Sequence, residues 1–161
     1  DYLAVIDKLR AVRPDIAMSG DFIVGFPGET DRDFAETLNL VSQVGYASAY
    51  SFKYSPRPGT PAASIDQQIP EHIKAERLES LQQLLNAQQF AFNSKTKDQI
   101  VDVLVERSGG RMGQMAGRSP YMQAVNFVGD ETQIGYILPC KLSEARQKSM
   151  SGEILTTKGA A

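Results

Sequence analysis

The sequence predicts an α/β segment followed by a small all-β barrel. Residues 1–96 carry helical and strand patterns in the order helix, strand, helix, strand, helix. From about Gln99 onward, short alternating or apolar runs are separated by glycine-containing turns, which is the pattern of a small barrel of the oligonucleotide-binding type. We therefore expect two domains, residues 1–96 and residues 97–161, with the boundary near residues 95–98.

The α/β segment opens with an amphipathic helix and a strand. Apolar residues at helical spacing predict a helix over residues 2–12, and Pro14 ends it. The run from 16 to 24 predicts the first strand. It leads into a turn at 27–29, Pro-Gly-Glu, and the end of such a strand is where α/β proteins bind ligands.

A capping box predicts the start of the second helix. Thr30 is followed three residues later by Asp33, and the helical pattern continues to Gly45, which closes it. The aromatic-rich run at 47–54 predicts a second strand, which the crossover rule makes parallel to the first. Two strands cannot close a barrel, so we expect the remaining strands to precede Asp1.

A proline-rich loop and a long helix follow the second strand. Three prolines within residues 56–61 stiffen the loop, and a stiff loop at a strand end is commonly a binding loop. Pro70 opens a helix that extends to about Lys95. We assign its glutamine-rich face to solvent: Gln82, Gln83, Gln88 and Gln89.

Five short strands are expected in the barrel. They cover residues 100–105, 112–116, 123–128, 134–142 and 152–156, and we expect them to pair antiparallel.

Composition limits the classes of function. The net charge of −2 argues against a strongly basic nucleic-acid binder, although residues 97–161 carry eight Lys or Arg against seven Asp or Glu. A single cysteine excludes an internal disulfide and suggests a reducing compartment, so we expect a cytoplasmic protein. No apolar run approaches the roughly 18 residues of a membrane span, and we expect neither a signal peptide nor membrane binding. We expect a monomer.

The turn after the first strand offers two interpretations. Its backbone N–H groups could bind a polar or anionic ligand at a helix N-terminus, or it could be only a turn. Asp21 and Glu29 could accept hydrogen bonds from a ribose or an ammonium group, or they could order the loop. His72 is expected at the surface and Cys140 in the barrel packing, and no spacing indicates a metal site or a catalytic residue.

Cations offer a second set of candidates. Arg57, in the proline-rich loop, could bind a carboxylate or phosphate with two parallel hydrogen bonds, or could anchor the loop. Six more lie in or beside turns of the barrel, where they could contact phosphates or be ordinary surface charge: Arg107, Arg111, Arg118, Lys141, Arg146 and Lys148.

Two motifs resemble the radical S-adenosylmethionine methylthiotransferase family. They are Asp-Phe-Ile-Val-Gly-Phe-Pro-Gly-Glu-Thr at 21–30 and the more specific Tyr-Ser-Phe-Lys-Tyr-Ser-Pro-Arg-Pro-Gly-Thr-Pro-Ala at 50–62. The barrel resembles the TRAM domain that follows in this family, with Gly-Arg-Ser at 117–119 and Val-Asn-Phe at 125–127. The resemblance covers essentially the whole chain. It implies that residues 1–96 are the last βα units of a radical-SAM barrel of TIM-like form.

The resemblance implies a function for the full-length protein. It would add a 2-methylthio group to N6-isopentenyladenosine beside the tRNA anticodon, using S-adenosylmethionine and 4Fe–4S clusters, and its partner would be the tRNA anticodon stem-loop. The family's Cys-x3-Cys-x2-Cys motif is not in this sequence. We expect it before Asp1, so this piece alone should be inactive and bind no cofactor. The alternatives are the branch of the family that modifies a ribosomal protein, and a non-catalytic nucleic-acid-binding module.

The resemblance also implies roles for individual residues. The S-adenosylmethionine side of the barrel would be lined by Ile23, Gly25, Phe52, Tyr54 and Ser55. Arg57 and Pro58 would shape the mouth where the substrate base enters, and the ribosomal-protein branch typically has acidic residues there. The tRNA backbone would be held by Arg107, Arg111, Arg118 and Lys141.

Overall fold

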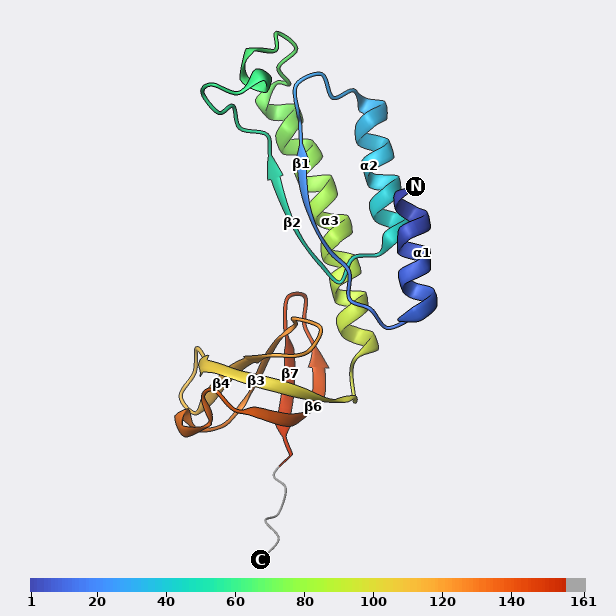
Figure 1. The fold of residues 1–161 in the computed structure, drawn as a ribbon. Coiled ribbons are helices and arrows are strands. Elements are labelled where there is room, and N and C mark those ends of the chain that lie inside the picture. Colours follow the sequence, from blue (N-terminus) through green and yellow to red (C-terminus); the bar gives the residue numbers. More distant parts are fainter. Residues whose placement is uncertain (156–161) are drawn as a thin grey trace, which may run out of the picture. The chain divides into compact units, whose positions relative to one another are not determined.

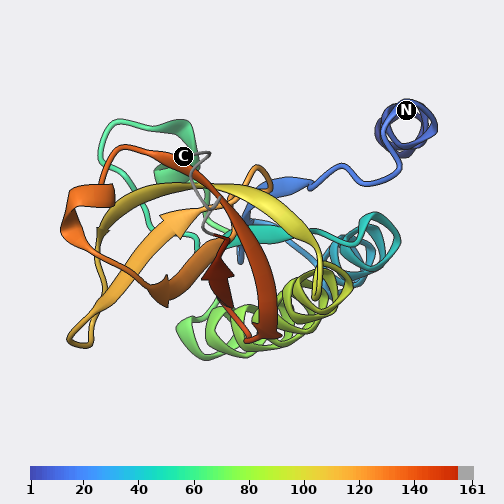
Figure 2. The ribbon, with the colours of Figure 1, turned by 90° about the horizontal axis from the view of Figure 1, so that it is seen from below.

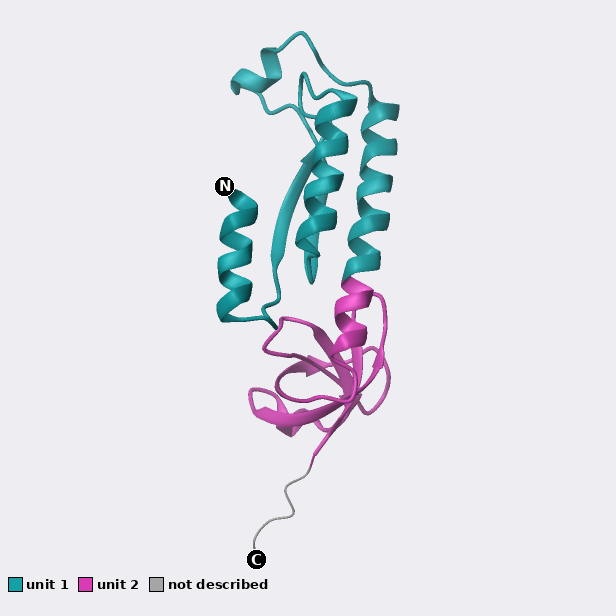
Figure 3. Cartoon of the chain, turned by 90° about the vertical axis from the view of Figure 1, so that its right-hand side faces the viewer, with its two compact units in different colours: residues 1–88 teal, residues 89–161 magenta. Residues whose placement is uncertain are grey.

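The computed structural model describes residues 1–155. The chain divides into two compact units, residues 1–88 and 89–161 (Figure 3). The long helix α3 (Glu71–Lys95) crosses that division, so its last turns belong to the second unit. Among the described residues, no helix has the length and apolar character needed to cross a membrane.

The first unit has the predicted order of helices and strands (Figure 1). It contains α1 (Tyr2–Val12), β1 (Ser19–Val24), α2 (Asp31–Val44), β2 (Ser48–Lys53), the short 3-10 helix η1 (Pro61–Ser64) and most of α3. The strand β1 starts three residues later than expected. It pairs in parallel with β2 from Ser19 opposite Ser48, so residues 16–18 precede the first paired position.

Helices cover one face of this two-stranded sheet. Phe22 and Val24 of β1 pack with Val41 and Val44 of α2 and with Leu81 of α3 in one apolar core. The capping box at the start of α2 is confirmed, because the Thr30 hydroxyl accepts from the Asp33 N–H at 3.2 Å and the Asp33 carboxylate accepts from the Thr30 N–H at 2.9 Å. Gly45 ends the helix in the left-handed region, at φ 62°.

The buried face of α3 includes two cations. Lys74 and Arg77, which are 7% and 6% exposed, lie in line with the buried Leu81 and Leu85. The assignment of Gln88 to solvent is wrong, because its side chain accepts from the Tyr46 N–H at 2.9 Å and donates to the Val41 carbonyl at 2.8 Å. The amide therefore joins α3 to the end of α2 and the start of β2.

The second unit is a closed five-stranded barrel (Figures 1 and 2). Its strands follow the order β3-β4-β5-β7-β6, and a short 3-10 helix, η2 (Glu131–Gln133), precedes β6. Their bounds are β3 (Ile100–Ser108), β4 (Gln114–Arg118), β5 (Ala124–Val128), β6 (Ile137–Ala145) and β7 (Met150–Ile154).

The expectation of purely antiparallel pairing is wrong for one pair of strands. β4 is antiparallel to both β3 and β5, so β5 has the direction of β3. β6 is antiparallel to both β3 and β7, so β7 has that direction too, and β5 and β7 are parallel. The last strand ends at Ile154, and the predicted strand residue Thr156 lies outside the described residues.

Apolar residues from all five strands fill the barrel. Cys140 is fully buried there, as predicted, and Gly152 allows its close approach, since a Cβ at Gly152 would lie 2.5 Å from the Cys140 sulfur. Burial raises the pKa of the Cys140 thiol to about 11. The buried core is formed by Val103, Val105, Met115, Val125, Phe127, Cys140, Leu142 and Met150.

Candidate cofactor face and nucleic-acid surface

The uncovered face of the β1–β2 sheet is apolar with one carboxylate. Ile23 of β1 lies opposite Phe52 of β2, and Asp21 lies opposite Tyr50. Ile23, Phe52 and Tyr50 are 59%, 55% and 72% exposed, and the carboxylate of Asp21 forms no hydrogen bond within residues 1–155. Two of the predicted cofactor residues, Ile23 and Phe52, are therefore neighbours on one accessible surface.

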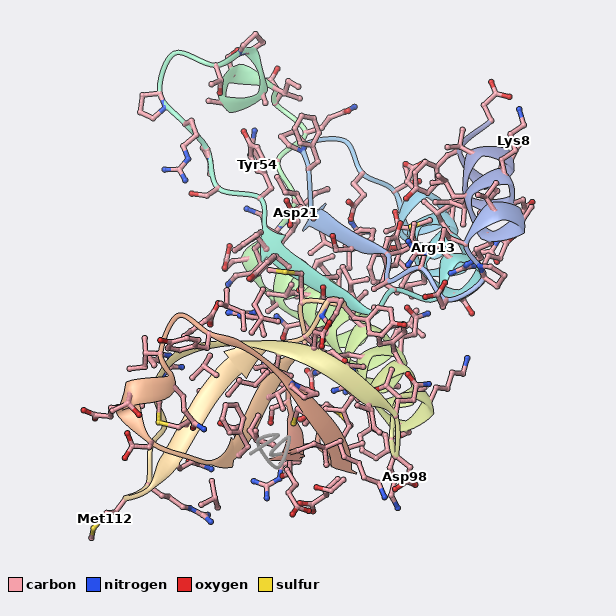
Figure 4. The ribbon with its side chains drawn as sticks, turned by 60° about the horizontal axis from the view of Figure 1, so that its bottom comes forward. Lys8, Arg13, Asp21, Tyr54, Asp98 and Met112 are labelled. Atoms are coloured by element: carbon pink, nitrogen blue, oxygen red, sulfur yellow. The ribbon has the colours of Figure 1, made fainter. Side chains whose placement is uncertain are left out.

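Tyr54 lies at the carboxyl end of the sheet, where the chain leaves β2 (Figure 4). Its N–H donates to the Val24 carbonyl at 2.8 Å, which extends the pairing by one residue. Its ring packs edge-on against Phe26 at 5.2 Å, and the Lys74 ammonium lies 5.7 Å from the ring centre. The Tyr54 hydroxyl is buried and has no hydrogen-bond partner among the described residues. Tyr54 thus packs toward α3, unlike Phe52.

Gly25 sits over the stem of Lys74. Its φ is 72°, in the left-handed region where glycine is favoured, and an added Cβ would lie 2.4 Å from the Lys74 Cγ. The Lys74 ammonium donates to the Tyr54 carbonyl at 3.4 Å. The backbone conformation and the buried lysine stem each require glycine at this position.

Four backbone N–H groups of the turn after β1 donate hydrogen bonds within the first unit. Both oxygens of the Glu29 carboxylate accept from the Gly25 N–H at 3.0 Å. The Gly28 N–H donates to the Gln67 carbonyl, the Glu29 N–H to the Phe26 carbonyl, and the Thr30 N–H to Asp33. These contacts favour the interpretation of this segment as a turn, and Glu29 orders the loop.

Arg77 of α3 holds this turn in place. One guanidinium nitrogen donates to the Glu29 carboxylate at 2.7 Å and the other donates to the Asp31 carboxylate at 2.7 Å. Burial alone would lower the pKa of Arg77, but these hydrogen bonds hold it above its usual value. The Arg77 side chain also lies 5.6 Å from the Phe34 ring centre. The Arg77 guanidinium therefore links α3 to the turn after β1 and to the first turn of α2.

The proline-rich loop presents its predicted residues to solvent. Ser55, Arg57 and Pro58 are exposed, and the Arg57 side chain forms no ion pair within the described part of the chain. The Arg57 carbonyl accepts from the N–H and the hydroxyl of Thr60, at 3.2 and 2.8 Å, so the backbone of the loop is ordered. Arg57 is free to contact a ligand.

The four predicted barrel cations are all exposed but do not form one cluster. Lys141 lies opposite Ile100, at the start of β3. Arg107 lies near the other end of β3, and Arg111 precedes Met112 at the tip of the β3–β4 loop (Figure 4). The nine residues of β3 span roughly 25 Å. Arg118 lies between these ends, pairs with Glu106 at 3.3 Å and donates to the Met122 carbonyl at 3.2 Å.

Sequence reasoning missed the two buried cations of α3. Lys74, Arg77, Leu81 and Leu85 repeat at intervals of three or four residues, so helical spacing alone could have placed the cations on the buried face. No cluster of three or more His, Cys, Asp or Glu among the described residues could hold a metal ion.

Comparison with known proteins identifies the class of the barrel first. Residues 95–155 match the family model described as the TRAM domain, so the closed barrel is a domain of this type. The whole chain has a wider match. It is 51% identical over 159 residues, 99% of its length, to the tRNA-2-methylthio-N(6)-dimethylallyladenosine synthase of Erythrobacter litoralis (strain HTCC2594), and it spans 35% of that protein. This match confirms the predicted resemblance to a tRNA methylthiotransferase. The chain spans about a third of that relative's length.

Proposed function

We propose that this chain is part of a tRNA methylthiotransferase, in which the α/β segment supplies one wall of a radical-SAM barrel and the TRAM domain contacts tRNA. The observation that supports this most strongly is the 51% identity over 99% of the chain to the synthase of Erythrobacter litoralis. The reaction would place a 2-methylthio group on N6-isopentenyladenosine beside the anticodon.

The open sheet face fits the adenosyl part of S-adenosylmethionine. Ile23 and Phe52 offer adjacent exposed apolar surface for a flat base, and Asp21 offers an unengaged carboxylate for hydroxyl or ammonium groups. S-adenosylmethionine supplies the 5′-deoxyadenosyl group and the methyl group when bound. In this proposal, Gly25 and Ser55 lie at the strand ends beside the site, while Tyr54 packs toward α3 and supports the end of β2.

An iron–sulfur cluster does not fit the residues of this chain. Cys140 is its single cysteine, fully buried among apolar side chains of the barrel. Cluster ligands would have to come from another part of the full-length protein. The role of the present segment is binding and positioning.

The barrel would hold the backbone of the tRNA. Arg107, Arg111, Arg118 and Lys141 are dispersed along β3 and its neighbouring strands, as expected for contacts to successive phosphates. Arg57, exposed in the proline-rich loop, would act where the substrate base enters.

The proposal is tested by titrating the chain with an anticodon stem-loop RNA at several salt concentrations. We expect affinity to fall as salt rises, and we expect Arg118→Ala to weaken binding and reduce the slope of log affinity against log salt by about one. Arg32→Ala, which removes an exposed arginine from α2, is the matched control and should leave the slope unchanged. Affinity that does not depend on salt would exclude phosphate contact by the barrel.

A further inference from the structure

Four buried polar side chains meet in the second unit, between the last turns of α3 and the barrel. Asn93, Thr96, Ser119 and Gln123 are between 2% and 8% exposed. Asn93 belongs to α3, while Ser119 and Gln123 bound the turn between β4 and β5. A buried amide is stable only if its hydrogen bonds are made, so the contacts of these groups define how helix and turn fit together.

Gln123 is at the centre of this network. Its amide nitrogen donates to the Asn93 Oδ1 at 3.0 Å and to the Thr96 hydroxyl at 2.9 Å. Its amide oxygen accepts from the Ser119 hydroxyl at 3.0 Å. The side chain therefore connects the end of α3 to both ends of the β4–β5 turn.

The β4–β5 turn positions Arg118. The Met122 N–H donates to the Ser119 carbonyl at 2.9 Å, and the Ser119 N–H donates to the Gln123 carbonyl at 3.1 Å. Met122 is thereby held at φ 62°, and its carbonyl accepts from the Arg118 guanidinium at 3.2 Å. A shift of this turn would move the Arg118 side chain.

Asn93 also holds the turn between β6 and β7. Its amide nitrogen donates to the Arg146 carbonyl at 2.9 Å, at the start of a tight turn closed by the Arg146 N–H on the Ser149 carbonyl at 2.8 Å. This turn carries Arg146 and the exposed Lys148, which forms no ion pair among the described residues. The side-chain oxygen of Asn93 is therefore hydrogen-bonded to the β4–β5 turn and its nitrogen to the β6–β7 turn, and both turns carry cations.

We propose that Asn93 is a positioning residue that holds the β4–β5 and β6–β7 turns together as one phosphate-contacting surface for RNA. Arg118 and Lys148 are the contacting cations, and Gln123 and Thr96 complete the support. The proposal rests on RNA binding by the barrel and adds a second cation-bearing turn to it. The edge-on contact between Phe92 and Tyr121, at 5.6 Å, supports the same arrangement with apolar surface.

The test measures RNA affinity against salt for the full chain carrying Asn93→Leu, which removes the polar amide and retains similar volume. We expect affinity to fall about tenfold and the salt slope to fall by one or two, because the two turns no longer present their cations together. Lys148→Ala should lower the slope by about one. Gln82→Leu, which removes an exposed amide from the same helix, is the matched control and should behave as the wild-type chain.

A second variant keeps the test decisive if Asn93→Leu does not fold. Thr96→Val removes one acceptor of Gln123 without changing side-chain shape, and the expected result is a smaller fall in slope in a folded chain. A folded Asn93→Leu or Thr96→Val chain with the wild-type slope would overturn the positioning role, while loss of slope in Arg118→Ala would still support RNA binding. A wild-type chain without salt-dependent binding would contradict RNA binding itself.

Discussion

Replacing Gly25 by alanine tests how the carboxyl end of β1 is built. Two costs are expected from the structure. An alanine at φ 72° costs about 1 kcal/mol, and its Cβ would lie 2.4 Å from the Lys74 Cγ, an overlap that costs about 2 kcal/mol more in a buried site. Lys74 is 7% exposed, so its stem cannot simply move into solvent. The expected loss of stability is therefore about 3 kcal/mol.

Gly45 provides the matched control for this substitution. It has φ 62°, close to that of Gly25, but a Cβ there would meet nothing within 4 Å. Gly45→Ala should cost only the backbone term, about 1 kcal/mol. Urea unfolding followed by far-ultraviolet circular dichroism measures both, since that signal reports on the helices.

A double-mutant cycle separates the overlap from the backbone term. In a Lys74→Ala chain, Gly25→Ala should lose most of its excess cost over Gly45→Ala, because the overlapping Cγ and Cδ are gone and only the Cβ of residue 74, at 3.2 Å, remains. Equal costs of the two glycine substitutions in the wild-type chain would refute the reasoning. So would an excess cost of Gly25→Ala that is undiminished in the Lys74→Ala chain.

Three further predictions follow from buried or hydrogen-bonded charges. Arg77→Met should destabilise the chain by about 2 kcal/mol, since it leaves the largely buried Glu29 carboxylate without its countercharge, and adding Glu29→Gln should recover part of the loss in urea unfolding. Cys140 should react with a thiol reagent only when the chain unfolds, because its side chain is fully buried. The pKa of its thiol in the folded chain, about 11, exceeds the ordinary 9.0, so the stability of the chain should fall as the pH rises above 9, and should fall less in Cys140→Ala. Hydrogen bonds from Thr30 lower the pKa of Asp33, so their contribution to the stability of α2 should be present at neutral pH and be lost as the pH falls through that lowered pKa. Asp33→Asn should remove this dependence of stability on pH.

Local sequence signals predicted the elements of the first unit well. The capping box at Thr30 and the terminating Gly45 gave the bounds of α2 as the structure has them, because both signals act through hydrogen bonds and dihedral angles within a few residues. The start of β1 was predicted less well. It depends on where β2 begins, and that is a property of the pairing between two distant segments.

Contacts between distant residues explain what the sequence could not supply. Glu29 and Asp31 are charged residues near a helix N-terminus, and only the structure brings Arg77, which lies 48 and 46 positions further along the chain, to both of them. Asn93 and Gln123 are likewise ordinary polar residues in their local patterns, and their burial together follows from how the barrel closes. The parallel pairing of β5 with β7 also follows from closure.

The most direct test of the proposed function is a chimera of the Erythrobacter litoralis synthase in which this chain replaces the matching segment. Mass spectrometry of nucleosides from tRNA treated with the chimera would measure the 2-methylthio product. We predict that the chimera forms this product, and that Phe52→Ala raises its KM for S-adenosylmethionine while Arg57→Ala lowers its modification of tRNA. A folded chimera that binds the anticodon stem-loop but forms no 2-methylthio product would contradict the proposal and indicate a nucleic-acid-binding module.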